Sequence, residues 1–472
     1  MNKFYGRKTE IKLLKNMELM SKDKSFMTFI IGNRRIGKTA LVNHCFNNKK
    51  NSLYFFVERK TEKQLVVDFL KIIDATINNF PRVSNFEDLF LNLQIASKNK
   101  PLNIIFDEFQ NFEYVNQAIF STIQKLWDKN KNNSKINLVC VGSIYSLMQK
   151  IFTSKKEPLY GRADSKMYLK PFDIVTLKTI NKDNNSKSYS VDKMFNLYVM
   201  FNGVAKYYDY LQNYNLFSKN SSSVFSILFL NKNSPLQQEG KDKIIEEFGK
   251  DYTVYFSILS AISELRSPSL NKISSLTGVS KTSLSAYLSN LEGKYNLISK
   301  QSPILTLKSK KGRYIFIDNL LNFWFRFIYS NQNLINFNQT DVILKTFNDD
   351  FRSYKGVVFE KFCQSIFKNS FDNFEYLEWG SYWDKNIEID IVGINKKSKE
   401  IFLVECKLSS KSINSSTVAN FKNKCNIYLE NFKNYNYRLA FCTLNKVKQK
   451  NMLQDKFDVE IIDEEDLDRL IK

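Results

Sequence analysis

The segment from Gly32 to Thr39 contains a complete phosphate-binding motif, in which Gly32 and Gly37 precede a Lys38-Thr39 pair. Glycines allow the backbone to turn tightly and to point successive N–H groups at phosphate oxygens. The ammonium of Lys38 suits the β- and γ-phosphates, and the hydroxyl of Thr39 is a ligand for Mg²⁺. We therefore expect ATP and Mg²⁺ here, and the alternative is a glycine turn without a ligand. The predicted nucleotide-binding residues of this segment are Gly32, Asn33, Arg34, Arg35, Ile36, Gly37, Lys38, Thr39 and Ala40.

Two adjacent acids, Asp107 and Glu108, end an apolar segment that begins at residue 103. At the end of a parallel strand, Asp107 can hold Mg²⁺ through water, and Glu108 can take a proton from the water that attacks the γ-phosphate. The alternative is a pair of solvated charges at a strand end. Ser143 ends a later apolar segment, residues 136–142, where it could sense the γ-phosphate or remain an ordinary strand-end serine. We predict catalytic roles for Asp107, Glu108 and Ser143 alongside Lys38.

A second group of charged residues, Asp390, Glu405 and Lys407, interrupts two apolar segments near the end of the chain. The period of two along a strand places Glu405 and Lys407 on one face. Charges within buried strands are costly unless they bind something. Asp390 and Glu405 offer the oxygen ligands that Mg²⁺ or Mn²⁺ prefers, and Lys407 would position a water or stabilise charge on phosphorus. The group predicts metal-dependent phosphodiester chemistry. The alternative is a site that has lost cleavage and is structural or only binds nucleic acid.

The elements that position the first group alternate between strand and helix over residues 1–175. Residues 25–31, 53–57, 103–108 and 136–143 are predicted strands, and residues 63–76 and 86–97 are predicted helices. The strands lack polar alternation, as expected of a parallel sheet that is covered on both faces. The polar stretches 181–188 and 218–223 are predicted to be unstructured linkers beside a helical lid over residues 176–240.

Residues 241–320 have the pattern of a winged helix-turn-helix. Predicted helices at 255–262 and 270–277 precede a turn at Gly278 and a third helix from Ser280, and residues 297–300 and 313–317 are predicted wing strands. Between Arg266 and Arg313 the chain has nine Lys or Arg residues and one acid, which favours phosphate contacts. The alternative is a domain that braces the lid or binds protein. The predicted DNA contacts are Lys272, Ser280, Lys281, Thr282 and Ser283.

Composition limits the class of protein. The 472 residues have a net charge of +22, which favours polyanionic partners, nucleic acid first. No apolar run approaches the 18 residues that span a bilayer, and no signal peptide opens the chain, so we expect a cytoplasmic protein without membrane insertion. A single histidine, His44, and six scattered cysteines leave almost no material for a structural zinc site or a histidine-based triad, and the thiols are expected to be reduced.

The N-terminal part resembles the archaeal-type ATPases of the AAA+/STAND P-loop class. The resemblance rests on the box at residues 4–7, the loop at 32–39, Asp107-Glu108, Gly142-Ser143 and residues 158–162. It implies that Tyr5 and Arg7 lie near the adenine. It also implies that Arg162 acts as a trigger for hydrolysis, against the alternative of a structural salt bridge. The glycine-rich segment 202–208 lacks the proline usual in that family, which puts a sensing role there in doubt.

Residues 350–445 resemble the PD-(D/E)xK nuclease superfamily, through Asp390, Glu405 and Lys407 and the upstream segment 356–362. The resemblance implies that Glu360, on that fold's first helix, is an auxiliary acid. Ile389 replaces the proline of the motif, and many relatives have lost cleavage. We thus expect an α/β fold with a P-loop core and parallel sheet (1–175), a helical lid (176–240), a winged helix-turn-helix (241–320) and a restriction-endonuclease-like domain (321–472).

Three functions remain open from the sequence. The first is an ATPase that acts on or at DNA and is coupled to a metal-dependent nuclease. The second is a nucleotide-dependent switch or scaffold, capable of homo-oligomerisation, with an inactive nuclease-like domain. The third is a transcription regulator that uses only its winged helix, in which duplex binding would survive loss of Lys38.

Overall fold

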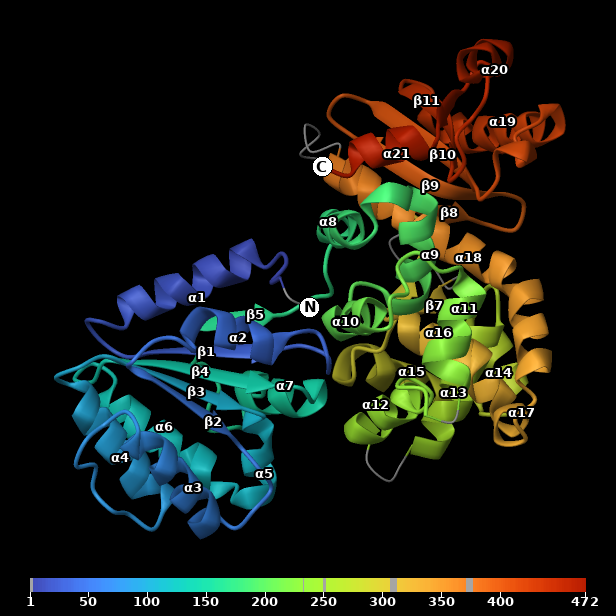
Figure 1. Cartoon of the computed structure of the whole chain (residues 1–472). Helices are drawn as coiled ribbons and strands as arrows, with labels where there is room; N and C mark the ends of the chain where they lie inside the picture. Colours follow the sequence, from blue (N-terminus) through green and yellow to red (C-terminus); the bar gives the residue numbers. More distant parts are fainter. Residues whose placement is uncertain (1–2, 232, 249–251, 306–311, 371–376) are drawn as a thin grey trace. The chain divides into compact units, whose positions relative to one another are not determined.

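The computed structural model describes residues 3–231, 233–248, 252–305, 312–370 and 377–472 (Figure 1). The chain forms two compact units. The first comprises Met1–Phe172 and Val204–Asp209, and the second comprises Asp173–Gly203 and Tyr210–Lys472. The first boundary lies close to the predicted end of the core at residue 175. The finer division of the second unit into lid, winged helix and nuclease-like domain stays a prediction.

The first unit is built on a parallel five-stranded sheet in the order β2-β3-β4-β1-β5. Its strands are β1 (Phe26–Ile31), β2 (Ser52–Phe56), β3 (Leu102–Asp107), β4 (Ile136–Gly142) and β5 (Ser165–Tyr168). The helices of this unit are α1 (Lys8–Met20), α2 (Lys38–Phe46), α3 (Glu62–Asp74), α4 (Phe86–Ser97), α5 (Phe112–Val115), α6 (Ala118–Asn130) and α7 (Tyr145–Thr153). The predicted strands and helices of this region are confirmed to within a few residues.

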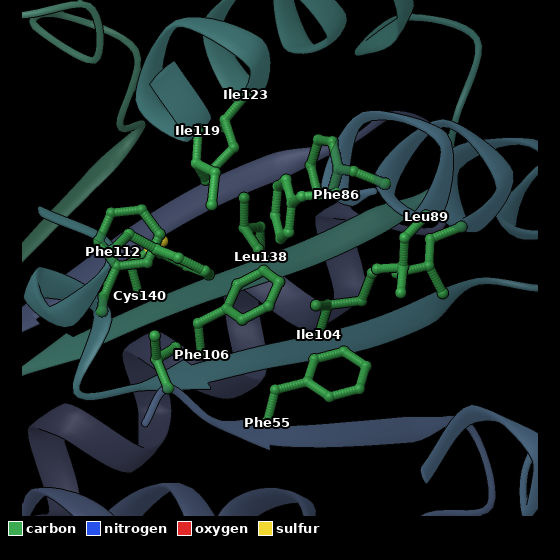
Figure 2. Packing of buried hydrophobic residues seen from close by; sticks show 14 of the residues in the cluster. Phe55, Phe86, Leu89, Ile104, Phe106, Phe112, Ile119, Ile123, Leu138 and Cys140 are labelled. Atoms are coloured by element: carbon green, nitrogen blue, oxygen red, sulfur yellow. The ribbon is translucent and has the colours of Figure 1, made fainter. Parts of the chain in front are cut away.

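Apolar residues cover both faces of this sheet, which explains why its strands lack polar alternation. On one face Phe106 and Leu138 point toward Phe86 of α4 and Ile119 of α6 (Figure 2). On the other face Ile105 belongs to a second cluster that α1 and α2 complete. Phe106 is fully buried, and burial of such a side chain contributes roughly 1.5–3 kcal/mol. The core therefore holds the strands, and the loops that follow them, in fixed positions.

The parallel arrangement brings the chemically active loops to one edge of the sheet. The phosphate loop follows β1, Asp107 is the last residue of β3, and Ser143 follows β4. Because β4 lies between β1 and β3, these three positions are adjacent at the carboxyl edge.

The second unit begins with helices and a short hairpin. Gly278, with φ of 72°, makes the turn between α14 (Leu270–Thr277) and α15 (Lys281–Ser289), and the side chains of Ser269 and Ser280 cap these two helices. Strands β6 (Ile298–Gln301) and β7 (Arg313–Phe316) pair in an antiparallel hairpin. The helices of this part are α8 (Ile174–Asn184), α9 (Val191–Phe201), α10 (Ala205–Asn213, shared with the first unit), α11 (Ser221–Phe225), α12 (Glu239–Phe248), α13 (Tyr252–Glu264), α14 (Leu270–Thr277), α15 (Lys281–Ser289) and α16 (Asn319–Phe327).

A second five-stranded sheet, in the order β12-β11-β10-β9-β8, ends the chain. Its strands are β8 (Leu377–Trp383), β9 (Glu388–Asn395), β10 (Glu400–Lys407), β11 (Asn436–Thr443) and β12 (Glu460–Ile462), and β9 and β10 form the predicted antiparallel hairpin. Phe421 of α19 packs in the core against this sheet. The remaining helices are α17 (Gln332–Asn336), α18 (Thr340–Ser370), α19 (Ser415–Leu429), α20 (Lys450–Phe457) and α21 (Glu464–Leu470).

The prediction that residues 181–188 and 218–223 are unstructured is wrong. Helix α8 continues to Asn184, a short 3₁₀ turn follows at Ser186–Ser188, and α11 begins at Ser221. The Asn220 side chain accepts a hydrogen bond from the Ser223 N–H at 2.8 Å, so it caps α11. Asn and Ser are the preferred residues at helix starts as well as in loops, which is why composition alone misplaced these segments.

Candidate functional site

The phosphate loop connects β1 to α2 and contains two left-handed residues, Arg35 (φ 67°) and Gly37 (φ 98°). Lys38 begins α2 and is 6% exposed. Its Nζ donates to the carbonyl oxygens of Gly32 at 2.7 Å and Asn33 at 3.1 Å. A β-carbon on Gly32 would lie 2.9 Å from the Leu169 carbonyl oxygen, so glycine is required there. The loop thus wraps around the ammonium that is predicted to meet the phosphates.

Asp107 and Thr39 meet at the carboxyl edge of the sheet. The Thr39 hydroxyl donates to Asp107 Oδ2 at 2.6 Å, and the Tyr54 hydroxyl donates to the same oxygen at 2.6 Å. Asp107 is 2% exposed. A hydroxyl and a carboxylate side by side are hard oxygen donors, so this pair fits the Mg²⁺ that the phosphate loop implies. Burial and the Asp107 carboxylate raise the pKa of Tyr54, which therefore stays a hydrogen-bond donor.

Glu108 is held by two partners on neighbouring loops. Its Oε2 accepts from the Ser143 hydroxyl at 2.7 Å and from the amide of Gln110. The backbone of Glu108 is left-handed, with φ of 56°, a conformation uncommon for residues that have a β-carbon. Such strain concentrates at functional sites. The structure therefore brings together Glu108 and Ser143, both predicted, with Gln110, which the sequence analysis missed.

Arg7 of the opening box braces the phosphate loop. Its guanidinium donates to the Ile36 carbonyl oxygen at 3.1 Å and to the Lys170 carbonyl oxygen at 2.7 Å. It also lies 4.8 Å from the centre of the Phe172 ring. Tyr5 is 8% exposed. Arg7 thus contacts the loop backbone directly, and the proximity of Tyr5 and Arg7 to the adenine stays a prediction.

A short segment from later in the chain contacts the same loop. The Lys206 N–H donates to the Arg35 carbonyl oxygen at 3.2 Å. A β-carbon on Gly37 would lie 3.5 Å from the β-carbon of Ala205. These residues belong to the segment whose missing proline put its sensing role in doubt. The contact gives it direct access to the phosphate loop.

Arg162 lies away from this edge. It precedes β5, whose first residue, Ser165, pairs with Thr28 near the start of β1. Its guanidinium binds the Asp128 carboxylate with N–O distances of 3.1, 3.1 and 2.7 Å. The phosphate loop follows the other end of β1. The geometry therefore favours the structural salt bridge over a trigger for the nucleotide of its own chain.

The second group of predicted residues lines a cleft of about 700 Å³ in the second unit. Val404 pairs with Ile391, so Asp390 lies beside Glu405 across the β9-β10 hairpin. Asp390 Oδ2 accepts from the Cys406 N–H at 2.8 Å. Burial, followed by the Glu405 charge, raises the pKa of Asp390 to about 7. Glu360 of α18 also lines the cleft, and burial followed by Asp390 raises its pKa well above the usual value.

Glu405 is paired with two lysines. The Lys407 ammonium lies 2.7 Å from its Oε1, and Lys424 of α19 lies 3.3 Å from its Oε2. Sequence analysis missed Lys424. No group of three or more His, Cys, Asp or Glu side chains that could hold a metal occurs among the described residues. Asp390 and Glu405 supply two oxygen donors, so the fit to a divalent ion is partial.

The predicted DNA contacts gather around the helix pair α14–α15. Ser280 caps α15, its Oγ accepting from the Ser283 N–H at 3.3 Å. The side chains of the predicted group are exposed, so they are accessible for binding: Lys272, Ser280, Lys281, Thr282 and Ser283. In the described part of the chain, no helix combines the length and apolar character required to cross a membrane.

Two family models match the chain. Residues 4–223 match a family described as an ATPase domain predominantly from Archaea, and residues 324–419 match one described as Archaea bacterial proteins of unknown function. The chain is also 29% identical over 411 residues to a Methanocaldococcus jannaschii protein named Uncharacterized protein MJECL04, covering 86% of this chain and 87% of the relative.

Two solved structures are similar to this chain. The Walker-type ATPase PABY2304 of Pyrococcus abyssi is 17% identical, with a TM-score of 0.54 over 68% of this chain and 96% of its own. The ORC2 protein of Aeropyrum pernix, solved as ADPNP–ADP complexes, is 14% identical and covers 73% of this chain and 95% of its own, with a TM-score of 0.45. The likeness to the Pyrococcus protein concerns the fold alone. The family match and the geometry of Lys38, Thr39 and Asp107 make the first unit a P-loop ATPase domain.

Proposed function

We propose that this chain is an ATPase that acts at DNA and is coupled to a metal-dependent, nuclease-like C-terminal domain. One observation carries the proposal: the second unit combines exposed polar residues around a capped helix pair with a cleft that contains Asp390, Glu405 and Lys407. An ATPase domain precedes both. Hydrolysis would supply motion, and the second unit would supply contact with nucleic acid.

In ATP hydrolysis the chain's own groups have separate tasks. The ammonium of Lys38 exchanges its two carbonyl partners for phosphate oxygens, and Glu108 accepts a proton from the attacking water. Ser143 and Gln110 hold Oε2 of that carboxylate, so its other oxygen is the proton acceptor. Mg²⁺ bound by Thr39, and through water by Asp107, would neutralise charge on the β- and γ-phosphates.

DNA contact is proposed for the capped helix pair. Ser280 lies at the first turn of α15, where exposed N–H groups and hydroxyls suit phosphate oxygens. Lys281 adds a cation at that turn, and Lys272 adds an exposed cation on α14. Phosphate contacts of this kind give binding that weakens steeply with salt.

In the cleft, Lys407 is positioned by Glu405 and is 29% exposed at its side chain, so its ammonium can reach a phosphate oxygen. The Cys406 N–H fixes the orientation of the Asp390 carboxylate. A divalent ion held by Asp390 and Glu405 would supply an activated water for phosphodiester hydrolysis.

The proposal is tested by measuring ATP turnover with and without duplex DNA, in parallel with cleavage of plasmid DNA in Mg²⁺ or Mn²⁺. We expect DNA to stimulate turnover. Asp390→Ala and Lys407→Ala should abolish nicking and leave ATP turnover intact. Lys396→Ala, which removes an exposed lysine paired with Glu378, is the matched control and should still nick. Nicking that persists in Asp390→Ala would place the nuclease activity elsewhere.

A second candidate function is a nucleotide-dependent switch with an inactive nuclease-like domain. The pairing of Glu405 with both Lys407 and Lys424 favours it, because two ammonium groups already compensate the carboxylate that a metal would need. This function predicts ATP-dependent oligomerisation in light scattering, turnover that DNA does not change, and no nicking in either metal.

A further inference from the structure

The cleft around Asp390 has a floor and two walls, all from the second unit. Strands β9 and β10 supply Asp390 and Glu405 as its floor. Helix α18 supplies one wall, which includes Gly356. A second wall comes from the segment after α13, with Arg266, and from the β6-β7 hairpin, with Arg313. The residues proposed to do phosphodiester chemistry therefore lie inside a cleft and not on an open face.

Specific contacts hold the hairpin wall against the edge of the sheet. Arg313 donates to Glu388 at 2.5 Å, and its guanidinium lies 4.4 Å from the centre of the Trp383 ring. The Ile304 N–H donates to the Ser381 carbonyl oxygen at 2.9 Å. A backbone hydrogen bond, an ion pair and a cation–π contact together fix this wall.

Charge is distributed unevenly in the cleft. Arg266 and Arg352 are exposed and Arg313 is partly buried, whereas Glu405 is 6% exposed. Arg266 and Arg352 therefore lie toward solvent and Glu405 lies deep in the cleft, while the exposed acids Asp349 and Glu388 also line it and Glu388 pairs with Arg313. An anionic chain would bind at the rim, with one of its phosphate groups directed toward the floor. Arginine suits that role because its planar guanidinium matches phosphate geometry.

We propose that this cleft binds a short single-stranded segment of nucleic acid, gripped by Arg266, Arg313 and Arg352 with a phosphodiester over Asp390 and Glu405. This inference rests on the proposed function for its ligand class. A cleft of about 700 Å³ lies within the range of pockets that enclose small ligands, roughly 300–1,000 Å³. A volume of this size suits one or two nucleotides of a single strand better than a base-paired duplex. In the proposed function, duplex DNA would contact the capped helix pair.

Gly356 supports a close approach of the ligand to α18. It lies within a helix of 31 residues, where glycine is unfavourable relative to alanine. A β-carbon built at Gly356 would meet no heavy atom of the described residues within 4 Å. Packing within the described chain therefore gives no reason for glycine there. Open space on the cleft wall leaves room for a nucleotide against the helix backbone.

The test measures the equilibrium binding of fluorescent 12-nucleotide probes to the full chain. Fluorescence anisotropy reports binding, and the titrations are made in EDTA at several salt concentrations. The probes are single-stranded DNA, the blunt duplex of the same sequence, and single-stranded RNA. We expect Arg266→Ala and Arg352→Ala to weaken single-strand binding about tenfold or more. Each should also reduce the magnitude of the negative slope of log affinity against log salt by about 0.7, the value for one phosphate contact of a single strand. Duplex binding should not change.

Two further variants complete the design. Gly356→Leu should fill the wall and weaken single-strand binding without lowering the melting temperature. Arg82→Ala, which removes an exposed arginine from the first unit, is the charge-matched control and should bind as wild type does. Affinity for RNA as well as DNA would support the inference and show that the sugar is not recognised.

Equal loss of duplex and single-strand binding in Arg266→Ala would overturn the inference, as would unchanged single-strand binding in correctly folded Arg266→Ala and Arg352→Ala. DNA stimulation of ATP turnover is measured separately. Its absence would refute the proposed function while single-strand binding by the cleft could still be observed.

Discussion

Replacement of Glu108 by glutamine isolates the proton-accepting oxygen of the ATPase site. Both hydrogen-bond donors, Ser143 at 2.7 Å and Gln110, reach Oε2. A glutamine of the same size can keep its carbonyl oxygen at that position, and its NH₂ then replaces Oε1. The amide cannot accept a proton from water. Glu108→Gln therefore removes the base and preserves the orientation of the side chain.

The expected magnitude follows from this separation. Loss of a positioned general base lowers a rate constant by roughly 10²–10⁴-fold, or about 3–5 kcal/mol in activation free energy. ATP affinity should change by less than about 1 kcal/mol, because Lys38 and Thr39 keep their places and the two hydrogen bonds to Oε2 are each worth about 1 kcal/mol net. The variant should therefore bind ATP and retain it unhydrolysed.

The assay pairs single-turnover hydrolysis of radiolabelled ATP with equilibrium binding of a fluorescent ATP analogue. Glu113→Gln is the matched control, since Glu113 is partly buried and pairs with Lys150, and this variant should turn over ATP within about twofold of wild type. Turnover by Glu108→Gln above a tenth of the wild-type rate would refute the assignment of Glu108 as the base.

Three other perturbations test different parts of the chain. Lys38→Ala should weaken ATP binding about 100-fold, measured by calorimetry, because the variant lacks the ammonium that would exchange two loop carbonyl oxygens for phosphate oxygens. The folded state raises the pKa of Asp390 to about 7, so it retains that proton at pH values where the unfolded chain has lost it. The stability this group contributes is therefore greatest at low pH and is lost as pH rises from about 4 to 7. Urea unfolding in EDTA should show that Asp390→Asn gains about 2–3 kcal/mol relative to wild type between pH 5 and pH 8, and a constant difference would contradict this. Lys243→Ala should cost about 3–5 kcal/mol by leaving Asp318 buried without its cation, whereas the exposed neighbour Lys241→Ala should cost under about 0.5 kcal/mol.

The sequence was most informative where chemistry depends on residues adjacent along the chain. The phosphate loop, Asp107 and Glu108 each follow an apolar strand, and the parallel sheet brings those strand ends together. The β9-β10 hairpin was predicted for a similar reason, since alternating apolar residues surround a short polar turn. Local patterns of this kind determine both the element and the face on which its side chains lie.

Residues that act across the fold were harder to predict. Tyr54 reaches Asp107 because β2 and β3 are neighbours. Lys424 lies on α19, 17 residues after Lys407 in the sequence, and reaches Glu405 from that helix. Gln110 lies two residues after Glu108, so its place near that carboxylate could have been predicted from the sequence. The role of Arg162 was predicted from family resemblance. The register of β5 against β1 then showed that Arg162 precedes the strand end that lies away from the phosphate loop.

The hydrogen bond from the Lys206 N–H to the Arg35 carbonyl has a mechanical consequence. Residues 204–209 belong to the first unit, while the chain on either side, up to Gly203 and from Tyr210, belongs to the second. The segment is therefore a strap anchored at both ends outside the ATPase core and fastened in its middle to the loop that grips phosphate. A displacement of that loop on triphosphate binding would therefore pull on the chain of the second unit from both ends of the strap, and hydrolysis would release it.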